Sequence, residues 1–356
     1  MSAIHTIEHE LEYRYGRAGR GSVMTLFVSP LVDRRQQLHE FSLETEPAGP
    51  VSGFLDPWGN RGHFFDRHAP HDRLRIFARS RVEVEPGAGD TAGDAGSGID
   101  VGLMLQPSRF VRPSSAVLEG FISASRIPRA HATLESLRNL RSRLYRLFEY
   151  TPGSTAAHSP IDRILQTGRG VCQDYAHVMA SICRRWGIPA RYVSGYLAPA
   201  PGATTRGESH AWVECWLPGL GWTGFDPAND SACGERHLRV AVGRDYGDVP
   251  PSRGVFSGAA ESVLITQVTI ASRGTDHIGD GDRGLQDSTL SRSTEPCKTQ
   301  SDPSSPASSS GSRRFSRPRP PPNPRTANPP QSGPTLSAAT SGAGPTSESP
   351  WPFSPR

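Results

Sequence analysis

Hydrophobic and polar side chains alternate, at least in part, along four stretches near the start of the chain, at residues 4–15, 41–46, 62–66 and 74–85. Alternation of this kind places successive side chains on opposite faces of a β-strand. Between the second and third stretches, Asp56-Pro57-Trp58-Gly59-Asn60 is a strong turn signal. No helical period interrupts the four stretches, so the pattern predicts a small antiparallel β domain over residues 1–86.

The hydrophobic period changes to three and four residues after a Gly-, Asp- and Ala-rich linker at residues 87–98. One amphipathic helix is predicted from its regularly spaced leucines, which are Leu134, Leu137, Leu140, Leu144 and Leu147. Ser159-Pro160 begins a second, short helix that Gly168 ends, and a third runs from Cys172 to Trp186. Strands are expected at residues 190–197, 210–217, 222–225 and 263–270. Helices followed by strands predict an α+β core over residues 99–273.

The composition changes again from about residue 274, where Ser, Pro, Gly and Thr dominate to the end of the chain. Such a segment has too few apolar side chains to offset the conformational entropy that ordering it would cost. Residues 274–356 are therefore predicted to form a disordered tail.

The formal net charge of the chain is +4, and its arginines are spread along the sequence. Nucleic-acid-binding proteins gather basic residues on one face or in one run, so no nucleic-acid partner is predicted. No stretch approaches the length of a membrane span, and the N-terminus has no charged leader followed by an apolar core. Five cysteines without paired spacing, in the absence of a leader, are typical of a reducing cytoplasm. We therefore expect a cytoplasmic protein with no membrane partner.

Cys172 stands at the predicted start of the third helix, behind Gly168-Arg169-Gly170. Unpaired amide donors and the helix dipole favour a negatively charged sulfur at this position, which is how many reactive cysteines are activated. The glycines before it would also let the backbone approach a ligand closely. The alternative is a buried structural cysteine, since free cysteines are among the most buried residues. Cys183, among apolar neighbours on the same helix, fits that alternative well.

His210 and Asp226 lie on two successive predicted strands joined by Leu217-Pro218-Gly219. If Trp216 faces Leu220 across this hairpin, the same register places His210 directly opposite Asp226. Directly opposed residues share a face, with Cβ atoms about 4.5–5.5 Å apart, so the carboxylate would reach the imidazole. Cys172, His210 and Asp226 together are the equipment of a thiol nucleophile with a base and an orienting acid. A purely structural hydrogen bond between His210 and Asp226 is the alternative.

Long ordered motifs of this sequence resemble the bacterial transglutaminase-like family. They are Gly170-Val171-Cys172-Gln173-Asp174-Tyr175-Ala176-His177, Gly187-Ile188-Pro189-Ala190-Arg191-Tyr192-Val193-Ser194-Gly195-Tyr196, Ser209-His210-Ala211-Trp212-Val213 and Gly221-Trp222-Thr223-Gly224-Phe225-Asp226-Pro227. The resemblance covers about residues 1–270 and includes the turn Asp56-Pro57-Trp58-Gly59-Asn60, while the tail departs from it.

The resemblance implies a papain-like α+β core with Cys172 as nucleophile, His210 as base and Asp226 as orienting acid. It also implies acyl transfer through a thioester, formed on a glutamine amide or a peptide bond of a protein or peptide substrate. This chemistry requires no metal and no cofactor. The acceptor is open: an amine would make the protein a crosslinking enzyme, and water would make it a cysteine protease or amidase. A non-catalytic protein-binding module is a further alternative.

Overall fold

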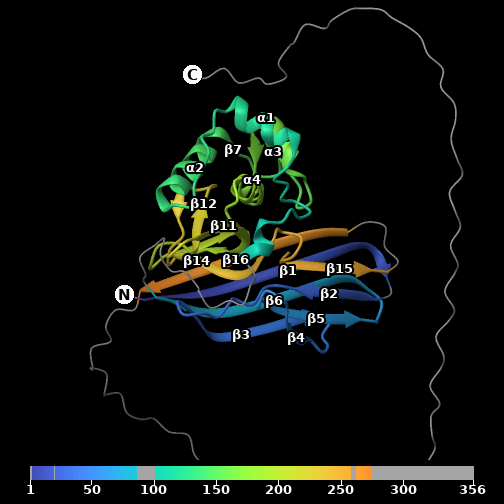
Figure 1. Cartoon of the computed structure of the whole chain (residues 1–356). Helices are drawn as coiled ribbons and strands as arrows, with labels where there is room; N and C mark the ends of the chain where they lie inside the picture. The colour runs from blue at the N-terminus through green and yellow to red at the C-terminus, as the bar shows by residue number, and fades with distance from the viewer. Residues whose placement is uncertain (1, 20, 86–100, 258–261, 275–356) are drawn as a thin grey trace, which may run out of the picture. The chain divides into compact units, whose positions relative to one another are not determined.

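The computed structural model describes residues 2–19, 21–85, 101–257 and 262–274. They form an α+β fold in which sheets built mainly from the N-terminal region pack against a core of helices and a sheet (Figure 1). The predicted linker at 87–98 and the predicted tail beyond residue 274 lie outside the described residues. None of the described helices is long and apolar enough to cross a membrane.

Two antiparallel sheets contain the strands of the N-terminal region. The larger sheet has the order β10 (Thr204–Gly207), β16 (Ser262–Gly274), β1 (Ala3–Gly19), β6 (His71–Val84) and β3 (Gln36–Glu46). The smaller sheet has the order β15 (Ser252–Phe256), β2 (Ser22–Leu26), β5 (Arg61–Arg67) and β4 (Ser52–Leu55). The inner residues of these strands alternate with exposed ones and share a cluster that includes Leu11, Leu26 and Ile76.

The predicted division between the β domain and the core is wrong at its C-terminal end. Residues 252–256 and 262–273, which the sequence pattern assigned to the core, lie in β15 and β16 of the two N-terminal sheets. β16 pairs with β1 along its whole length, from Ala3 opposite Gly274 to Tyr15 opposite Ser262. Alternation along a single strand shows that it has one buried face, but it carries no information on which distant strand it pairs with. The short strands β2 and β4 were not predicted either.

The core has a second five-stranded sheet and four α-helices. The sheet has the order β13 (Ser231–Ala232), β12 (Gly221–Asp226), β11 (His210–Leu217), β9 (Ala190–Leu197) and β14 (His237–Gly243). The helices are α1 (Ala116–Ala124), α2 (Leu134–Leu147), α3 (Ile161–Thr167) and α4 (Cys172–Arg185), preceded by a short 3-10 helix, η1 (Val101–Leu105). Two short parallel strands, β7 (Glu149–Tyr150) and β8 (Arg169–Gly170), lie beside the start of α4.

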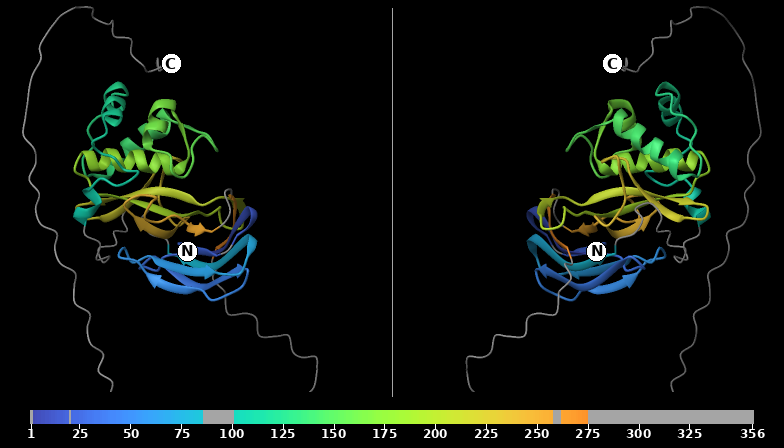
Figure 2. Two further views of the ribbon diagram at one scale, coloured as in Figure 1. Left: turned by 90° about the vertical axis from the view of Figure 1, so that its right-hand side faces the viewer. Right: turned by 90° about the vertical axis from the view of Figure 1, so that its left-hand side faces the viewer.

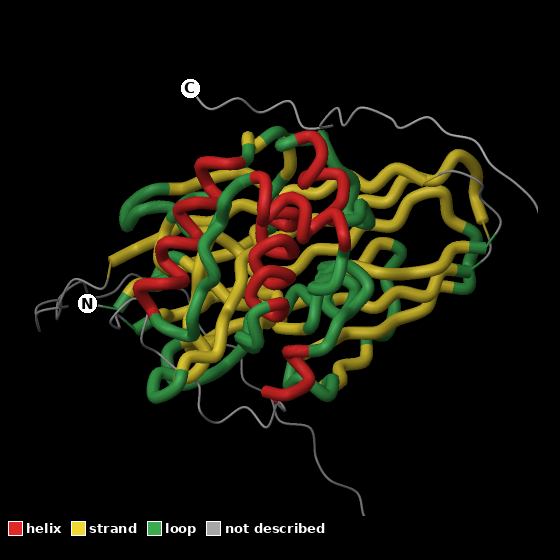
Figure 3. The backbone as a smooth tube through the Cα atoms, turned by 45° about the horizontal axis from the view of Figure 1, so that its top comes forward, coloured by secondary structure: helices red, strands yellow, loops and turns green. Residues whose placement is uncertain are grey.

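The helix α4 is the centre of the core and lies across strands β9 and β11 (Figure 3). Every residue from Cys172 to Arg184 is buried, because the sheet covers one side of the helix and α2 and α3 cover others. The buried Arg184 side chain donates to the carbonyl oxygens of Ala190 and Gln106. These bonds hold the C-terminal end of α4, which runs from Cys172 to Arg185 and confirms the predicted third helix.

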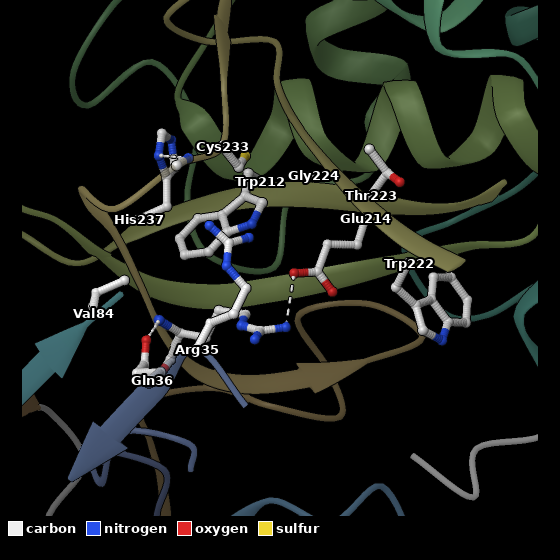
Figure 4. Close-up of a pocket in the computed structure, with 12 residues that line it drawn as sticks. Arg35, Gln36, Val84, Trp212, Glu214, Trp222, Thr223, Gly224, Cys233 and His237 are labelled. Atoms are coloured by element: carbon white, nitrogen blue, oxygen red, sulfur yellow. Dashed lines mark hydrogen bonds and ion pairs between the residues drawn. The ribbon is translucent and has the colours of Figure 1, made fainter. Parts of the chain in front are cut away.

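The helices lie on one face of the core sheet, and the N-terminal sheets lie across the other (Figures 1 and 2). On that second face a buried ion pair joins Arg191 to Glu214 at 2.6 Å. Gln36 ties the N-terminal region to the core, since its amide donates to the Arg239 carbonyl at 2.7 Å and accepts from the Arg239 N–H at 2.9 Å. Gln36, Glu214 and Arg239 are among the residues that line a small cavity of about 40 Å³ (Figure 4).

Candidate active site

Cys172 is the first residue of α4, and its side chain is nearly buried at the start of the helix. Asp174 holds this start in place: its carboxylate accepts from the Val171 N–H at 2.8 Å and from the Thr155 hydroxyl at 2.5 Å. The remaining free amides of the first turn and the helix dipole place partial positive charge beside the sulfur. The structure therefore has Cys172 at the first residue of a helix, as predicted.

The glycine before this helix serves packing. A Cβ on Gly170 would lie 2.5 Å from the Ile164 methyl group and 3.0 Å from the Asp174 Cβ. Its missing side chain thus lets β8 approach α3 and α4. The sequence suggested that the glycines let the backbone approach a ligand, but Gly170 is explained by its packing against Ile164 and Asp174.

His210 and Asp226 meet, although the predicted register of their hairpin is wrong. The imidazole Nε2 lies 2.7 Å from Asp226 Oδ2. Trp216 faces Trp222 rather than Leu220, so the pairing is shifted by two residues and Asp226 is diagonal to His210. A shift of two keeps both side chains on one face, whereas a shift of one would have separated them. The cause is the turn: Leu220 N–H donates to Leu217 O at 3.0 Å around Pro218 and Gly219, and Gly219 has a φ of 80°.

Two residues that the sequence did not single out complete the surroundings of Asp226. The His237 Nε2 lies 3.2 Å from Asp226 Oδ2, and the Asn229 side-chain amide donates to the same oxygen at 2.8 Å. Because the Gly234 N–H donates to His237 Nδ1, the proton of that ring is on Nε2 and points at the carboxylate. Asn229 could have been suspected from its place in a turn directly after Asp226. His237 lies on another strand and gives no local signal.

The carboxylate of Asp226 is fully buried and accepts five hydrogen bonds. The donors are His210, His237 and Asn229 side chains and the backbone N–H groups of Ala228 and Asn229. Burial alone raises the pKa of Asp226, but hydrogen bonds from His210 and His237 outweigh it, so the pKa lies far below its ordinary value. Asp226 is therefore a fixed negative charge beneath the imidazole.

His210 is held between Asp226 and Cys172. Burial lowers the pKa of His210, but hydrogen bonds with Asp226 and with the Cys172 side chain, together with their charges, raise it to about 10. Since Nε2 faces Asp226, Nδ1 is the nitrogen left to face the sulfur. The Trp212 ring lies against both imidazoles of this group. Its centroid is 6.1 Å from the ring centroid of His210 and 5.1 Å from that of His237. The arrangement favours a protonated imidazole between the Asp226 carboxylate and the Cys172 sulfur.

Cys172 and His210 line a cavity of about 680 Å³. One wall comes from residues 150–157, which follow the start of β7, and another from residues 208–211 at the start of β11. The third comes from the N-terminal sheets, through His9 on β1 and Leu264 and Thr266 on β16. Among the described residues that line it, Glu208 is the acidic side chain and none is an arginine. The cavity is large enough for a peptide side chain and its neighbours.

Two other features have structural explanations. His177 is buried between Phe110 and Tyr192, and its Nε2 accepts from the Tyr246 N–H. Burial lowers the pKa of His177 to about 4, so the ring is neutral. Within the described part of the chain, His210, Asp226 and His237 bring possible metal-ligand atoms within 4.8 Å of one another. A metal there would have to displace the ring protons that both histidines direct at Asp226, so metal binding and the observed hydrogen bonds are mutually exclusive.

The arrangement is that of a papain-like core, and comparisons with known proteins agree. The model of the transglutaminase-like superfamily matches residues 123–227, and that of the bacterial transglutaminase-like N-terminal region matches residues 5–83. An uncharacterized protein of Mycobacterium leprae is 35% identical over 277 residues, which cover 74% of this chain and 97% of the relative. The chain therefore belongs to the transglutaminase-like superfamily, as its motifs predicted.

Two further similarities are more limited. A protein-glutamine gamma-glutamyltransferase of Pseudomonas aeruginosa is 37% identical over 120 residues, or 28% of this chain and 18% of that protein. A solved structure from Cytophaga hutchinsonii, described provisionally as a cysteine protease, superposes with a TM-score of 0.62 at 19% identity. It covers 78% of this chain and 92% of that one. The second similarity confirms the fold, including the N-terminal sheets.

Proposed function

We propose that the protein is a transglutaminase-like cysteine enzyme that acts on a protein or peptide carboxamide, with Cys172, His210 and Asp226 as its triad. The observation that carries the proposal is the position of His210, whose ring lies 2.7 Å from a buried carboxylate and hydrogen-bonds Cys172 in the wall of a large cavity. A structural role would not require a nearly buried cysteine, a charged imidazole and a cavity to meet at one helix start.

The chemistry follows from these positions. The Cys172 sulfur attacks the carbonyl carbon of the amide, and a tetrahedral intermediate with a negatively charged oxygen forms. As the C–N bond breaks, His210 gives its proton to the departing amine and a thioester remains on Cys172. His210 then takes a proton from the acceptor, which attacks the thioester and releases the sulfur as thiolate. Asp226 stabilises the imidazolium and fixes its orientation throughout.

An amine acceptor is the form that we propose first, because a relative with a transglutaminase description is 37% identical to part of this chain. The acceptor is tested by incubating the protein with a glutamine-containing peptide, with and without a fluorescent primary amine. Ammonia release together with incorporation of the amine supports acyl transfer. Ammonia or peptide fragments without incorporation would identify a hydrolase, and peptide binding without turnover a binding module.

The nucleophile is tested separately with iodoacetamide at neutral pH, followed by mass spectrometry. We expect the first adduct on Cys172, because Cys183 and Cys215 are fully buried with their sulfurs 3.6 Å apart. Cys172→Ala should abolish both labelling and turnover, while Cys233→Ala, a cysteine outside the cavity, should retain both. Turnover by Cys172→Ala, or earlier labelling of Cys183 or Cys215, would overturn the assignment.

A further inference from the structure

Tyr150 is brought to the start of α4 by backbone pairing. It lies on β7, opposite Gly170 of β8, and therefore two residues ahead of Cys172 along the paired strand. The neighbouring hydrogen bonds fix this register: Glu149 N–H donates to Gly168 O at 2.8 Å and Thr151 N–H to Gly170 O at 2.9 Å. Asp174 and Thr155 hold the same corner from the other side. The place of Tyr150 beside the sulfur is thus built into the fold.

The side chain of Tyr150 lines the same cavity as Cys172 and His210. Its ring is half exposed, with its centroid 6.3 Å from that of the buried Tyr175. Its hydroxyl lies within hydrogen-bonding reach of both the side chain and the backbone of Cys172. An amide can only donate, so the hydroxyl oxygen accepts from the Cys172 N–H, and its own proton is directed to the sulfur.

We propose that Tyr150 is a further catalytic residue, whose hydroxyl forms the oxyanion hole together with the Cys172 backbone amide. The inference rests on the proposed acyl-transfer function. The negatively charged oxygen of the tetrahedral intermediate is two bonds from the sulfur, so its donors must flank Cys172 closely. In the free protein, the Tyr150 oxygen accepts the hydrogen bond of the Cys172 N–H, which the substrate oxygen needs. When the substrate carbonyl displaces it, rotation of the hydroxyl is enough to make it the second donor.

Two observations support Tyr150 over its neighbours. The Gln173 side chain, which follows Cys172 directly, already donates to the Ala157 carbonyl at 2.8 Å. Burial and the Cys172 charge raise the pKa of Tyr150 above its ordinary value, so the hydroxyl keeps the proton that it needs to donate to an oxyanion. No proton leaves Tyr150 in any step, since His210 carries the proton transfers.

The test compares acyl transfer with alkylation of the same sulfur. Acyl transfer passes through an oxyanion, whereas iodoacetamide reacts by direct displacement of iodide and forms none. In Tyr150→Phe we expect kcat to fall roughly 10²–10³-fold, the effect of losing one oxyanion donor. KM and the rate of Cys172 alkylation should stay within about threefold of the unchanged protein, because His210 and the helix start still activate the sulfur and the remaining cavity wall still binds the substrate. Tyr145→Phe, an exposed tyrosine on α2 outside the cavity, is the matched control.

Two results would overturn this role. An unchanged or increased kcat in Tyr150→Phe would show that the hydroxyl only covers the sulfur. A parallel loss of kcat and alkylation rate would show that it positions Cys172 rather than stabilising the oxyanion. Failure of the proposed function looks different, because the unchanged protein would then turn over no carboxamide at all. A melting temperature equal to that of the unchanged protein would show that each variant retains the fold.

Discussion

Asp226 is the residue on which the candidate site converges, because His210 and His237 both direct a ring proton at the same carboxylate oxygen. The two histidines are not equivalent. His210 also faces Cys172 and lines the cavity, whereas His237 lies on the opposite side of the carboxylate beside Trp212. His210 is therefore the proton carrier in the proposed mechanism, and His237 helps to hold Asp226 still.

Replacement of the carboxylate separates these roles. Asp226→Asn removes the charge and turns an amide N–H toward rings that already present protons, so His210 should adopt the wrong tautomer. We expect turnover to fall roughly 10⁴-fold, as when a triad carboxylate becomes an amide, with the fold retained. His237→Gln, which still offers Asp226 a donor, should lose less than about tenfold. Steady-state kinetics of both variants checks this, and near-normal turnover by Asp226→Asn would remove Asp226 from the mechanism.

The proton on His210 sets a pH dependence. Its pKa is raised from 6.5 to about 10, so the imidazolium persists across neutral pH and is lost as the pH rises through about 10. We expect the alkaline limb of kcat/KM near that pH. The same proton stabilises the fold fully below pH 6.5, and this contribution fades between pH 6.5 and about 10.

Titration of the His210 ring by NMR checks the shift directly. In Cys172→Ala the hydrogen bond and the charge of the sulfur are gone, so the pKa of His210 should move down relative to the unchanged protein. A midpoint near 6.5 in the unchanged protein would contradict the ion pair.

At the scale of elements, the site depends on how tightly β8 packs beneath the start of α4. Gly170→Ala would place a Cβ 2.5 Å from Ile164 and 3.0 Å from the Asp174 Cβ, which belongs to the helix itself. We expect a loss of about 1–3 kcal/mol in the free energy of unfolding, measured by denaturant titration, because the helix start must shift. Gly16→Ala on β1 is the matched control, since a Cβ there meets nothing within 4 Å. Equal stability of the two variants would show that the corner can relax.

The hairpin of β11 and β12 shows what element-scale inference can and cannot decide. Alternation correctly predicted that His210 and Asp226 share a face, because the side-chain period of a strand is two. The predicted register was wrong by two residues, because the register depends on where the turn at Pro218 and Gly219 begins. The sequence is compatible with two neighbouring positions of this turn.

At the scale of the whole molecule, β16 pairs with the first strand of the chain, β1, and also contributes to the cavity. It lies between β10 and β1 in the larger sheet and brings Leu264 and Thr266 to the cavity wall. A chain that ends at Gly274 should keep the melting temperature and turnover of the full chain, because the composition of residues beyond it cannot build a core. A chain that ends at Phe256 should lose both, since β1 then loses one of its two neighbouring strands from Ala3 to Tyr15 and keeps only β6. Thermal melting followed by circular dichroism and the amine-incorporation assay distinguish the two chains. A large loss of melting temperature or turnover in the chain that ends at Gly274 would show that the tail contributes to stability or activity.

The charge of the cavity wall predicts a substrate preference. With Glu208 as its acidic side chain and no arginine among its described lining residues, the cavity should favour peptides with a basic residue beside the reacting amide over peptides with an acidic one. Kinetics on matched basic and acidic peptides checks this. Glu208→Gln should narrow the difference mainly through KM, and an unchanged difference would place the preference elsewhere.

Local sequence patterns were sufficient to predict the amphipathic period of α2, the buried helix α4 with Cys172 at its first residue, and the face shared by His210 and Asp226. Each follows from a repeat of two or of three to four residues, or from a turn signal within a few positions. The pairing of β16 with β1, the approach of His237 to Asp226 from another strand and the place of Tyr150 beside Cys172 could be found only in the folded chain. These contacts join residues far apart in the sequence, and they are selected by packing and loop closure over the whole chain, which no local pattern records.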